Sequence, residues 1–165
     1  MSSYQQFLKD YKDNQIYETI AAQKALDYYN RLHANQHHKF RLGIVVDGTN
    51  YFKCHYDFEI IAPRDAYSIY IEVKRDRLME STGNVFVEFA NPNGSPSGIS
   101  KSQSHFYIIT NLNADAYHLI STKWIKYVIT LLSKSGRLVV RRNPGGGKGY
   151  IIPKAILIDE NSIQL

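Results

Sequence analysis

Residues 68–74, SIYIEVK, constrain the fold more than any other stretch, because aliphatic and other side chains alternate along them. Successive side chains of a β-strand point to opposite faces of its sheet. Three aliphatic residues therefore share one face, while Tyr70, Glu72 and Lys74 share the other. Such a strand needs neighbouring strands and an apolar layer against one face. It also places Glu72 and Lys74 about 7 Å apart on one surface.

Helical segments are predicted near both ends of the chain. Residues 3–34 contain neither Gly nor Pro and carry apolar side chains at helical spacing. This pattern predicts one or two helices, with a break at residues 13–14. The same spacing predicts a longer helix over residues 122–133, closed by Gly136. A short helical turn is expected at residues 100–104.

Other segments have the composition and alternation of β-strands. These segments are residues 42–46, 54–61, 68–74, 84–89 and 105–110, with a last pair at 137–142 and 150–152 around a glycine loop. Turn residues separate them at 47–50, 62–65 and 82–84, and a Pro- and Gly-containing loop spans 91–98.

Helices and strands in this order predict an α/β fold in which helices flank a mixed central sheet. The chain has 165 residues, of which 44% are hydrophobic, and this suits one compact domain. We therefore expect a single domain over residues 1–165. It comprises an N-terminal helical segment at 3–34, a core at about 42–135 and a C-terminal hairpin at 137–158.

Charge and cysteine content narrow the class of protein. The net charge of +5 favours polyanionic partners and serves solubility equally well. The single cysteine, Cys54, excludes an intrachain disulfide and a CxxC metal module, and it suits a reducing compartment. The N-terminus does not resemble a signal peptide, and no stretch approaches the roughly 20 apolar residues that span a bilayer. We expect a cytoplasmic protein with no membrane partner.

A second acidic segment lies one strand before Glu72. Asp57 and Glu59 share one face of the predicted strand at 54–61, and antiparallel pairing through the turn at Pro63 would bring one of them beside Glu72. Neighbouring carboxylates repel each other unless a cation neutralises them, and oxygen ligands favour Mg²⁺ or Mn²⁺. A lysine beside such a site suits hydrolysis of a phosphodiester. The alternative, an exposed Glu–Lys pair on a solvated strand, is equally compatible with the pattern alone.

The segment Asp57…Glu72-Val73-Lys74 after an N-terminal helix resembles the D…(D/E)xK signature of the PD-(D/E)XK nuclease superfamily. The longer segment EVKRDRLMESTGNVFVE…GSPSGISKSQSHFYI resembles a small branch of that superfamily common in phages and mobile elements. The match covers residues 57–109, about a third of the chain. It implies a restriction-endonuclease-like αβββαβ core and a metal-dependent nuclease.

The resemblance also implies roles for individual residues. Asp57, Glu72 and the carbonyl of Val73 would bind Mg²⁺, or Mn²⁺ in its place, and Lys74 would be catalytic. Glu18 loosely matches a helix glutamate that some members add to the metal site, although a solvated helix residue is the competing interpretation.

Two further glutamates are candidates for supporting the metal site. Glu88 either supports it or is an exposed strand residue, and Glu59 is the second candidate. The sequence departs from the family pattern in two places: Tyr56 stands where a proline often precedes the aspartate, and Gln103-Ser104-His105 replaces a small and acidic pair. The second departure leaves the placement of the last core strand open.

Two kinds of segment are candidates for contacting DNA. Hydroxyl-rich turns could donate hydrogen bonds to phosphates, and a basic hairpin tip could bind the backbone. The candidate residues are Thr82, Asn84, Ser97, Ser100, Arg141, Arg142 and Lys148. Tight turns and a solvated loop are the alternatives. The glycine loop is not a Walker A motif, because Gly149 follows Lys148 where Ser or Thr is required.

The leading hypothesis is a Mg²⁺-dependent nuclease. We expect it to be an endonuclease and its nucleic-acid substrate to be DNA. The alternative is a non-catalytic member of the same fold that binds DNA or a protein. A homodimer would supply two active sites for the two strands of a duplex.

Overall fold

The computed structural model describes residues 3–35, 38–45, 55–159 and 162–165. Its larger sheet has six strands: β1 (Arg41–Val45), β2 (Phe58–Ile61), β3 (Ser68–Arg75), β5 (Phe106–Thr110), β6 (Tyr117–Ser121) and β9 (Ile163–Gln164). They lie in the order β1-β2-β3-β5-β6-β9. β3 and β5 run parallel, whereas the other neighbours are antiparallel, so the sheet is mixed.

A smaller antiparallel sheet has the order β4-β8-β7. Its strands are β4 (Asn84–Ala90), β7 (Val139–Arg142) and β8 (Lys148–Pro153). Two longer helices, α1 (Ser3–Leu32) and α4 (Thr122–Lys134), accompany the sheets. Four short helical segments complete the fold: η1 (Pro63–Asp65), α3 (Met79–Thr82), η2 (Gly98–Ser100) and a π-helix, η3 (Ala155–Asp159).

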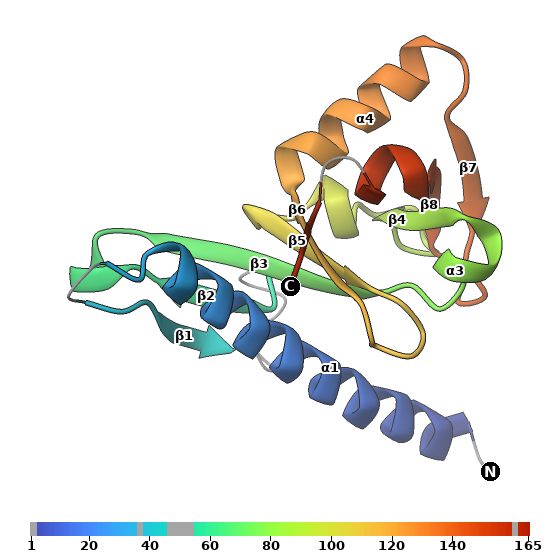
Figure 1. Cartoon of the computed structure of the whole chain (residues 1–165). Helices are drawn as coiled ribbons and strands as arrows, with labels where there is room; N and C mark the ends of the chain where they lie inside the picture. The colour runs from blue at the N-terminus through green and yellow to red at the C-terminus, as the bar shows by residue number, and fades with distance from the viewer. Residues whose placement is uncertain (1–2, 36–37, 46–54, 160–161) are drawn as a thin grey trace.

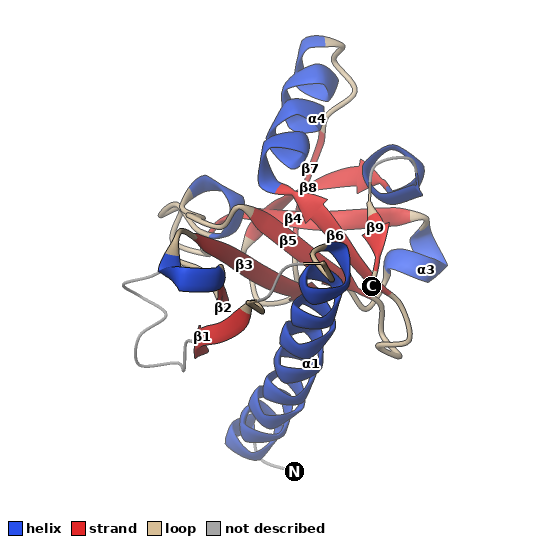
Figure 2. Cartoon of the chain, turned by 60° about the vertical axis from the view of Figure 1, so that its left-hand side comes forward, coloured by secondary structure: helices blue, strands red, loops and turns tan. Residues whose placement is uncertain are grey.

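The two faces of the larger sheet are covered by different elements (Figures 1 and 2). On one face, α1 packs through Ala21, Ala22, Ala25 and Tyr29 against the aliphatic side of β2 and β3. On the other face, α4, the π-helix and the smaller sheet enclose a second core with β5 and β6. The three alanines carry small side chains, so α1 can approach the sheet closely. The chain is a mixed α/β protein whose central sheet is flanked by helices, as the sequence predicts.

The alternation in β3 explains this layering. Ile69, Ile71 and Val73 are buried under α1. On β5, Ile108 belongs to the same core, whereas Tyr107 and Ile109 belong to the core under α4. A central strand therefore contributes to both cores, because successive side chains point to opposite faces.

Several boundaries differ from the predicted ones. Helix α1 is continuous to Leu32, with no break at residues 13–14. The helical turn expected at 100–104 lies earlier, at Gly98–Ser100. The segment predicted as a strand at 84–89 pairs with β8 and not with the larger sheet.

Strands β6 and β9 were not predicted, since each is short and owes its conformation to pairing with distant partners. The turn predicted at 47–50 and Cys54 lie outside the described residues. No helix in the described part of the chain is long and apolar enough to cross a membrane.

Candidate active site

The two acidic residues singled out in the sequence meet where β2 begins. Phe58 of β2 pairs with Ile71 of β3, which sets Asp57 beside Glu72 on the neighbouring strand. The Asp57 amide donates to the Ile71 carbonyl at 2.9 Å, and the Val73 amide donates to Oδ2 of Asp57 at 2.5 Å. Asp57 is 7% exposed and Glu72 is 1% exposed. The two carboxyl groups therefore share a site from which most water is excluded.

Lys74 lies on the same face of β3 as Glu72, two residues further on. Its Nζ is 2.6 Å from Oε1 of Glu72. The side chain of Lys74 is 40% exposed, whereas that of Glu72 is 2% exposed. The pair is therefore not the solvated Glu–Lys pair of the alternative interpretation, because its acidic member is buried.

Electrostatics at this site favour an added positive charge. Burial, and then the neighbouring Glu72, raise the pKa of Asp57 to about 8, although Lys74 and the Val73 amide act in the opposite direction. Near neutral pH the buried carboxyl therefore binds a proton readily. A cation placed between the two carboxylates would take over the role of that proton.

Glu18, on α1, interacts electrostatically with residues of this site. Burial is the main cause of its raised pKa, and Lys74 lowers while Glu72 raises that pKa. Glu18 lies one helical turn before Ala22, on the stripe of α1 that packs against the sheet. The charges of Glu72 and Lys74 therefore influence Glu18, but Glu18 does not join the acidic pair in a cluster of three carboxylates within the described residues.

The donor set suits a hard divalent cation. The two buried carboxylates offer oxygen atoms of the kind that Mg²⁺ and Mn²⁺ prefer, and the Val73 carbonyl stays a predicted third ligand. Within the described residues, no cluster of three or more His, Cys, Asp or Glu side chains is arranged around a metal position. The suitability of this site for a divalent cation therefore rests on the acidic pair and on the raised pKa of Asp57.

Glu59 and Glu88 take different places. Glu59 pairs with Tyr70, and its carboxylate lies over β1, where a Cβ at Gly43 would be 2.8 Å from Oε2. Glu88 accepts hydrogen bonds from Ser97 Oγ at 2.7 Å and from Asn143 Nδ2 at 3.3 Å. It therefore joins the loop before η2 to the β7–β8 turn. Glu88 also lines a small cavity together with Lys74, which brings this junction next to Lys74.

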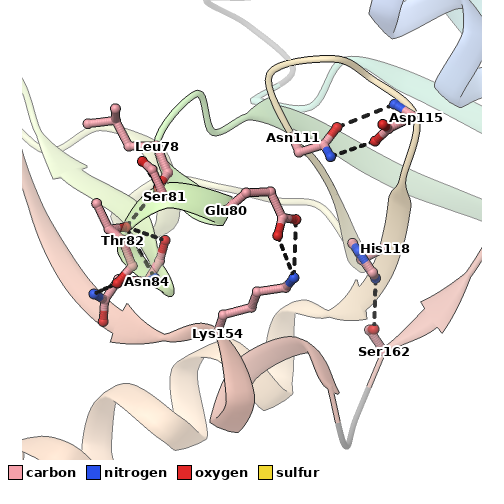
Figure 3. Close-up of polar contacts among 10 residues, drawn as sticks. All are labelled: Leu78, Glu80, Ser81, Thr82, Asn84, Asn111, Asp115, His118, Lys154 and Ser162. Atoms are coloured by element: carbon pink, nitrogen blue, oxygen red, sulfur yellow. Dashed lines mark hydrogen bonds and ion pairs between the residues drawn. The ribbon is translucent and has the colours of Figure 1, made fainter.

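The turns that are candidates for contacting DNA lie in two different regions of the structure. Thr82 and Asn84 close the turn after α3: Thr82 Oγ1 donates to the Leu78 carbonyl at 2.8 Å, and Asn84 Nδ2 donates to the Thr82 carbonyl at 2.7 Å (Figure 3). Asn84 lies four residues before Glu88, about 13 Å along β4. Ser97 lies at the Glu88 junction, and Ser100 ends η2 nearby.

The basic candidates lie on the smaller sheet. Arg141 and Arg142 are exposed on β7, and Arg142 pairs with Lys148 of β8 across the hairpin. Asn143 closes the hairpin by accepting from the Gly147 amide at 2.8 Å. The three cations therefore lie at one end of a defined hairpin.

Three further side chains have structural roles. Arg75 stacks over the Tyr17 ring at 3.9 Å and donates to the Leu112 carbonyl. Glu80 forms an ion pair with Lys154 at 3.0 Å (Figure 3). Trp124, on α4, packs against the core under that helix.

Sequence reasoning missed an aromatic column beside the acidic pair. The Tyr70 ring stacks on Tyr56 with a centroid distance of 4.4 Å and on His105 with a centroid distance of 5.2 Å. The alternation in β3 placed Tyr70 on the face of Glu72, and Tyr56 precedes Asp57. No local signal identifies His105, because the pairing of β5 with β3 brings it there.

A larger cavity, of about 720 Å³, lies elsewhere, at the C-terminal end of α1. Its lining includes Lys24, Arg31, His33, Lys39 and Asp27. The lining does not include the acidic pair or Lys74. The volume of a cavity therefore does not identify the candidate active site.

Fold and site together define a mixed α/β protein with a buried acidic pair and a lysine on adjacent strands. No protein-family model and no curated protein matches the chain. Among solved structures, the chain is similar to D212, a nuclease from a fusselovirus, with a TM-score of 0.50 and 12% sequence identity. The similarity covers 88% of this chain and 85% of that protein. At this identity the likeness concerns the fold.

Proposed function

We propose that this protein is a Mg²⁺-dependent nuclease of the PD-(D/E)XK type that hydrolyses phosphodiester bonds in DNA. The observation that carries the proposal is the buried Asp57 beside buried Glu72, with Lys74 Nζ 2.6 Å from Glu72. The fold shared with a viral nuclease supports the same assignment.

In this proposal Asp57, Glu72 and the Val73 carbonyl hold the cation, and Glu18 on α1 is a candidate for a further carboxylate. When bound, the cation polarises phosphate oxygens and makes water more acidic. The other catalytic group in this proposal is Lys74. Its ammonium group is open to solvent on one side, so it can donate a hydrogen bond to the attacking water and offset the charge that develops on the phosphate.

The proposed substrate contacts extend from this site toward the smaller sheet. Glu88 holds the Ser97 loop against the β7–β8 turn, and the exposed Arg141 and Arg142 lie on the adjoining strand. Neutral donors and cations are the groups that proteins use to bind phosphates. The net charge of +5 agrees with a polyanionic substrate.

Replacement of Glu72 by Gln tests the proposal, since the change keeps the side-chain shape and removes the charge. We expect the parent protein to cleave circular duplex, linear duplex or single-stranded DNA with Mg²⁺ and to be inactive with a chelator. Nicked or linearised circles would identify an endonuclease. Glu72→Gln should lose at least about 100-fold in rate, a typical effect for a group of the reaction centre.

Glu80→Gln is the matched control, because Glu80 forms an ion pair with a lysine but is exposed. It should cleave as fast as the parent. Equal cleavage by the Glu72 variant, with a folded circular dichroism spectrum, would disprove the site assignment. A parent protein that binds DNA but never cleaves it would instead favour the non-catalytic alternative.

A further inference from the structure

Three aromatic rings form a continuous stack beside the acidic pair. Tyr70 lies in the middle, with Tyr56 on one side at an interplanar angle of 21° and His105 on the other at 14°. The rings come from three separate segments: the residues before β2, strand β3, and the residue preceding β5. Near-parallel rings at these separations are the geometry in which a further flat aromatic group can continue a stack.

The backbone holds this stack in place. The His105 amide donates to the Tyr70 carbonyl at 2.7 Å, and the Tyr70 amide donates to Nδ1 of His105 at 3.0 Å. Because Nδ1 accepts a hydrogen bond, the imidazole carries its proton on Nε2. His55 has a left-handed backbone conformation with φ of 51°, and the chain bends there before Tyr56 joins the stack. The column is therefore organised before any ligand arrives.

The position of the column relates it to the reaction centre. Tyr70 and Glu72 lie on one face of β3, about 7 Å apart along the strand. Tyr56 immediately precedes Asp57. Tyr56 and Tyr70 are half-buried, whereas His105 is exposed, so the column ends in a ring that is accessible to solvent.

We propose that the Tyr56–Tyr70–His105 column is a platform on which an unpaired nucleobase of single-stranded nucleic acid stacks beside the scissile phosphate. This inference rests on the proposed nuclease function. In a duplex each base is covered by its neighbours, so an aromatic side chain can stack fully only on a base that is unpaired or at a strand end. The preferred substrate is therefore a single strand or an unpaired region.

The test measures DNA binding separately from cleavage. The Glu72→Gln protein, kept in a chelator, is titrated into a fluorescent single-stranded 12-nucleotide DNA and into a duplex of the same length, and anisotropy is recorded. We expect tighter binding to the single strand. Adding His105→Ala should weaken single-strand binding by about 5- to 150-fold, the range expected for one lost base-stacking contact. Duplex affinity should change by less than about twofold, because the duplex cannot use the platform.

Two further variants make the result specific to stacking. His105→Phe keeps a ring but not the imidazole nitrogens, and it should restore most of the single-strand affinity. Tyr127→Ala is the matched control, because Tyr127 is an aromatic residue 56% exposed on α4, and it should bind like the parent. Equal losses of single-strand and duplex affinity in His105→Ala, or no loss of either, would overturn the platform.

Cleavage by the parent protein in Mg²⁺ separates the two proposals. If the parent cleaves DNA but His105→Ala binds the single strand unchanged, the platform is wrong and the nuclease assignment stands. If His105→Ala selectively loses single-strand binding but the parent cleaves no DNA, the nuclease assignment is wrong and the platform stands.

Discussion

Lys74 Nζ lies 2.6 Å from Oε1 of Glu72, and only the lysine end of this ion pair is open to solvent. A buried carboxylate is costly unless a positive charge or hydrogen bonds compensate it. Lys74 supplies that compensation from the solvent-exposed side of the pair. The same ammonium group lowers the pKa of Asp57 and of Glu18, so it acts on all three carboxyl groups.

Removal of this charge should strongly reduce DNA cleavage and also lower the stability of the folded protein, because Glu72 loses its compensating cation. We expect Lys74→Ala to reduce DNA cleavage by at least about 100-fold, because a positioned donor contributes this much to such reactions. Initial rates on single-stranded and duplex DNA, with circular dichroism melting curves, measure both effects. Lys126→Ala, at an exposed lysine on α4, is the control. A Lys74→Ala protein as active as Lys126→Ala would exclude a catalytic lysine here.

Without divalent cations, stability should fall as pH rises from about 4 to about 8. The folded protein binds the Asp57 proton more tightly than the unfolded chain, since the pKa is raised from 3.8 to about 8. The resulting stabilisation is complete below the unfolded pKa and is lost as pH rises through the folded pKa. Thermal melting in a chelator between pH 5 and pH 8 measures this loss.

Asp57→Asn should flatten the pH profile, because the amide does not ionise. Glu18 contributes in the same direction, since its pKa is also raised. Asp65→Asn, at a side chain 70% exposed, should keep the slope of the parent. A slope unchanged by Asp57→Asn would show that another group causes the pH dependence.

Mg²⁺ or Mn²⁺ should reverse this destabilisation at pH 8. A ligand that binds only the folded protein stabilises it by about 2.7 kcal/mol at 100 times its dissociation constant. Melting temperatures over a Mg²⁺ titration should rise for the parent but not for Asp57→Asn or Glu72→Gln. Glu18→Gln should shift the titration to higher Mg²⁺ if its carboxylate belongs to the site. An unshifted titration would remove Glu18 from the ligand set.

Glu88→Ala should loosen two loops at once. The change leaves Ser97 Oγ and Asn143 Nδ2 without their shared acceptor, and the loss of such hydrogen bonds typically costs about 1–3 kcal/mol. Hydrogen exchange should become faster at residues 97–101 and 143–147 together. Glu80→Ala, which breaks the exposed ion pair with Lys154, should leave both segments protected as in the parent. Faster exchange in only one segment would contradict a shared junction.

Two glycines provide a test of the contact between η2 and β4. Gly98 and Gly94 both have positive φ, of 47° and 85°, but only at Gly98 would a Cβ overlap the Glu88 carbonyl oxygen. Gly94→Ala should cost about 1–2 kcal/mol from backbone strain alone. Gly98→Ala should cost about 1–3 kcal/mol more from overpacking. Urea unfolding measures the difference, and equal losses would show that the loop adjusts freely.

Local patterns predicted much of the sheet and its acidic strands. The alternation of residues 68–74 predicted a strand with Tyr70, Glu72 and Lys74 on one face. The short turn at residues 62–65 makes antiparallel pairing of β2 with β3 the simplest connection, and that pairing sets Asp57 beside Glu72. These inferences hold because strand geometry and tight turns depend on neighbouring residues.

The pairing of distant segments could not be predicted from such local patterns. The sequence predicted a strand at 84–89 but not its pairing with β8, because nothing in those residues specifies a partner more than 50 positions away. Strand β6 was missed for the same reason: the five residues Tyr117–Ser121 run directly into α4, and their pairing with β5 makes them a strand. The solvent exposure of a candidate residue likewise depends on distant segments of the chain.

The sequence by itself determined the mixed α/β class, the strand that carries Glu72 and Lys74, and the acidic residue on the strand before it. Only the tertiary structure decided that the carboxyl groups are buried and that His105 completes an aromatic column with Tyr70. Side-chain direction follows from the local backbone. Burial, charge interactions and stacking depend on which distant segments the folded chain brings together.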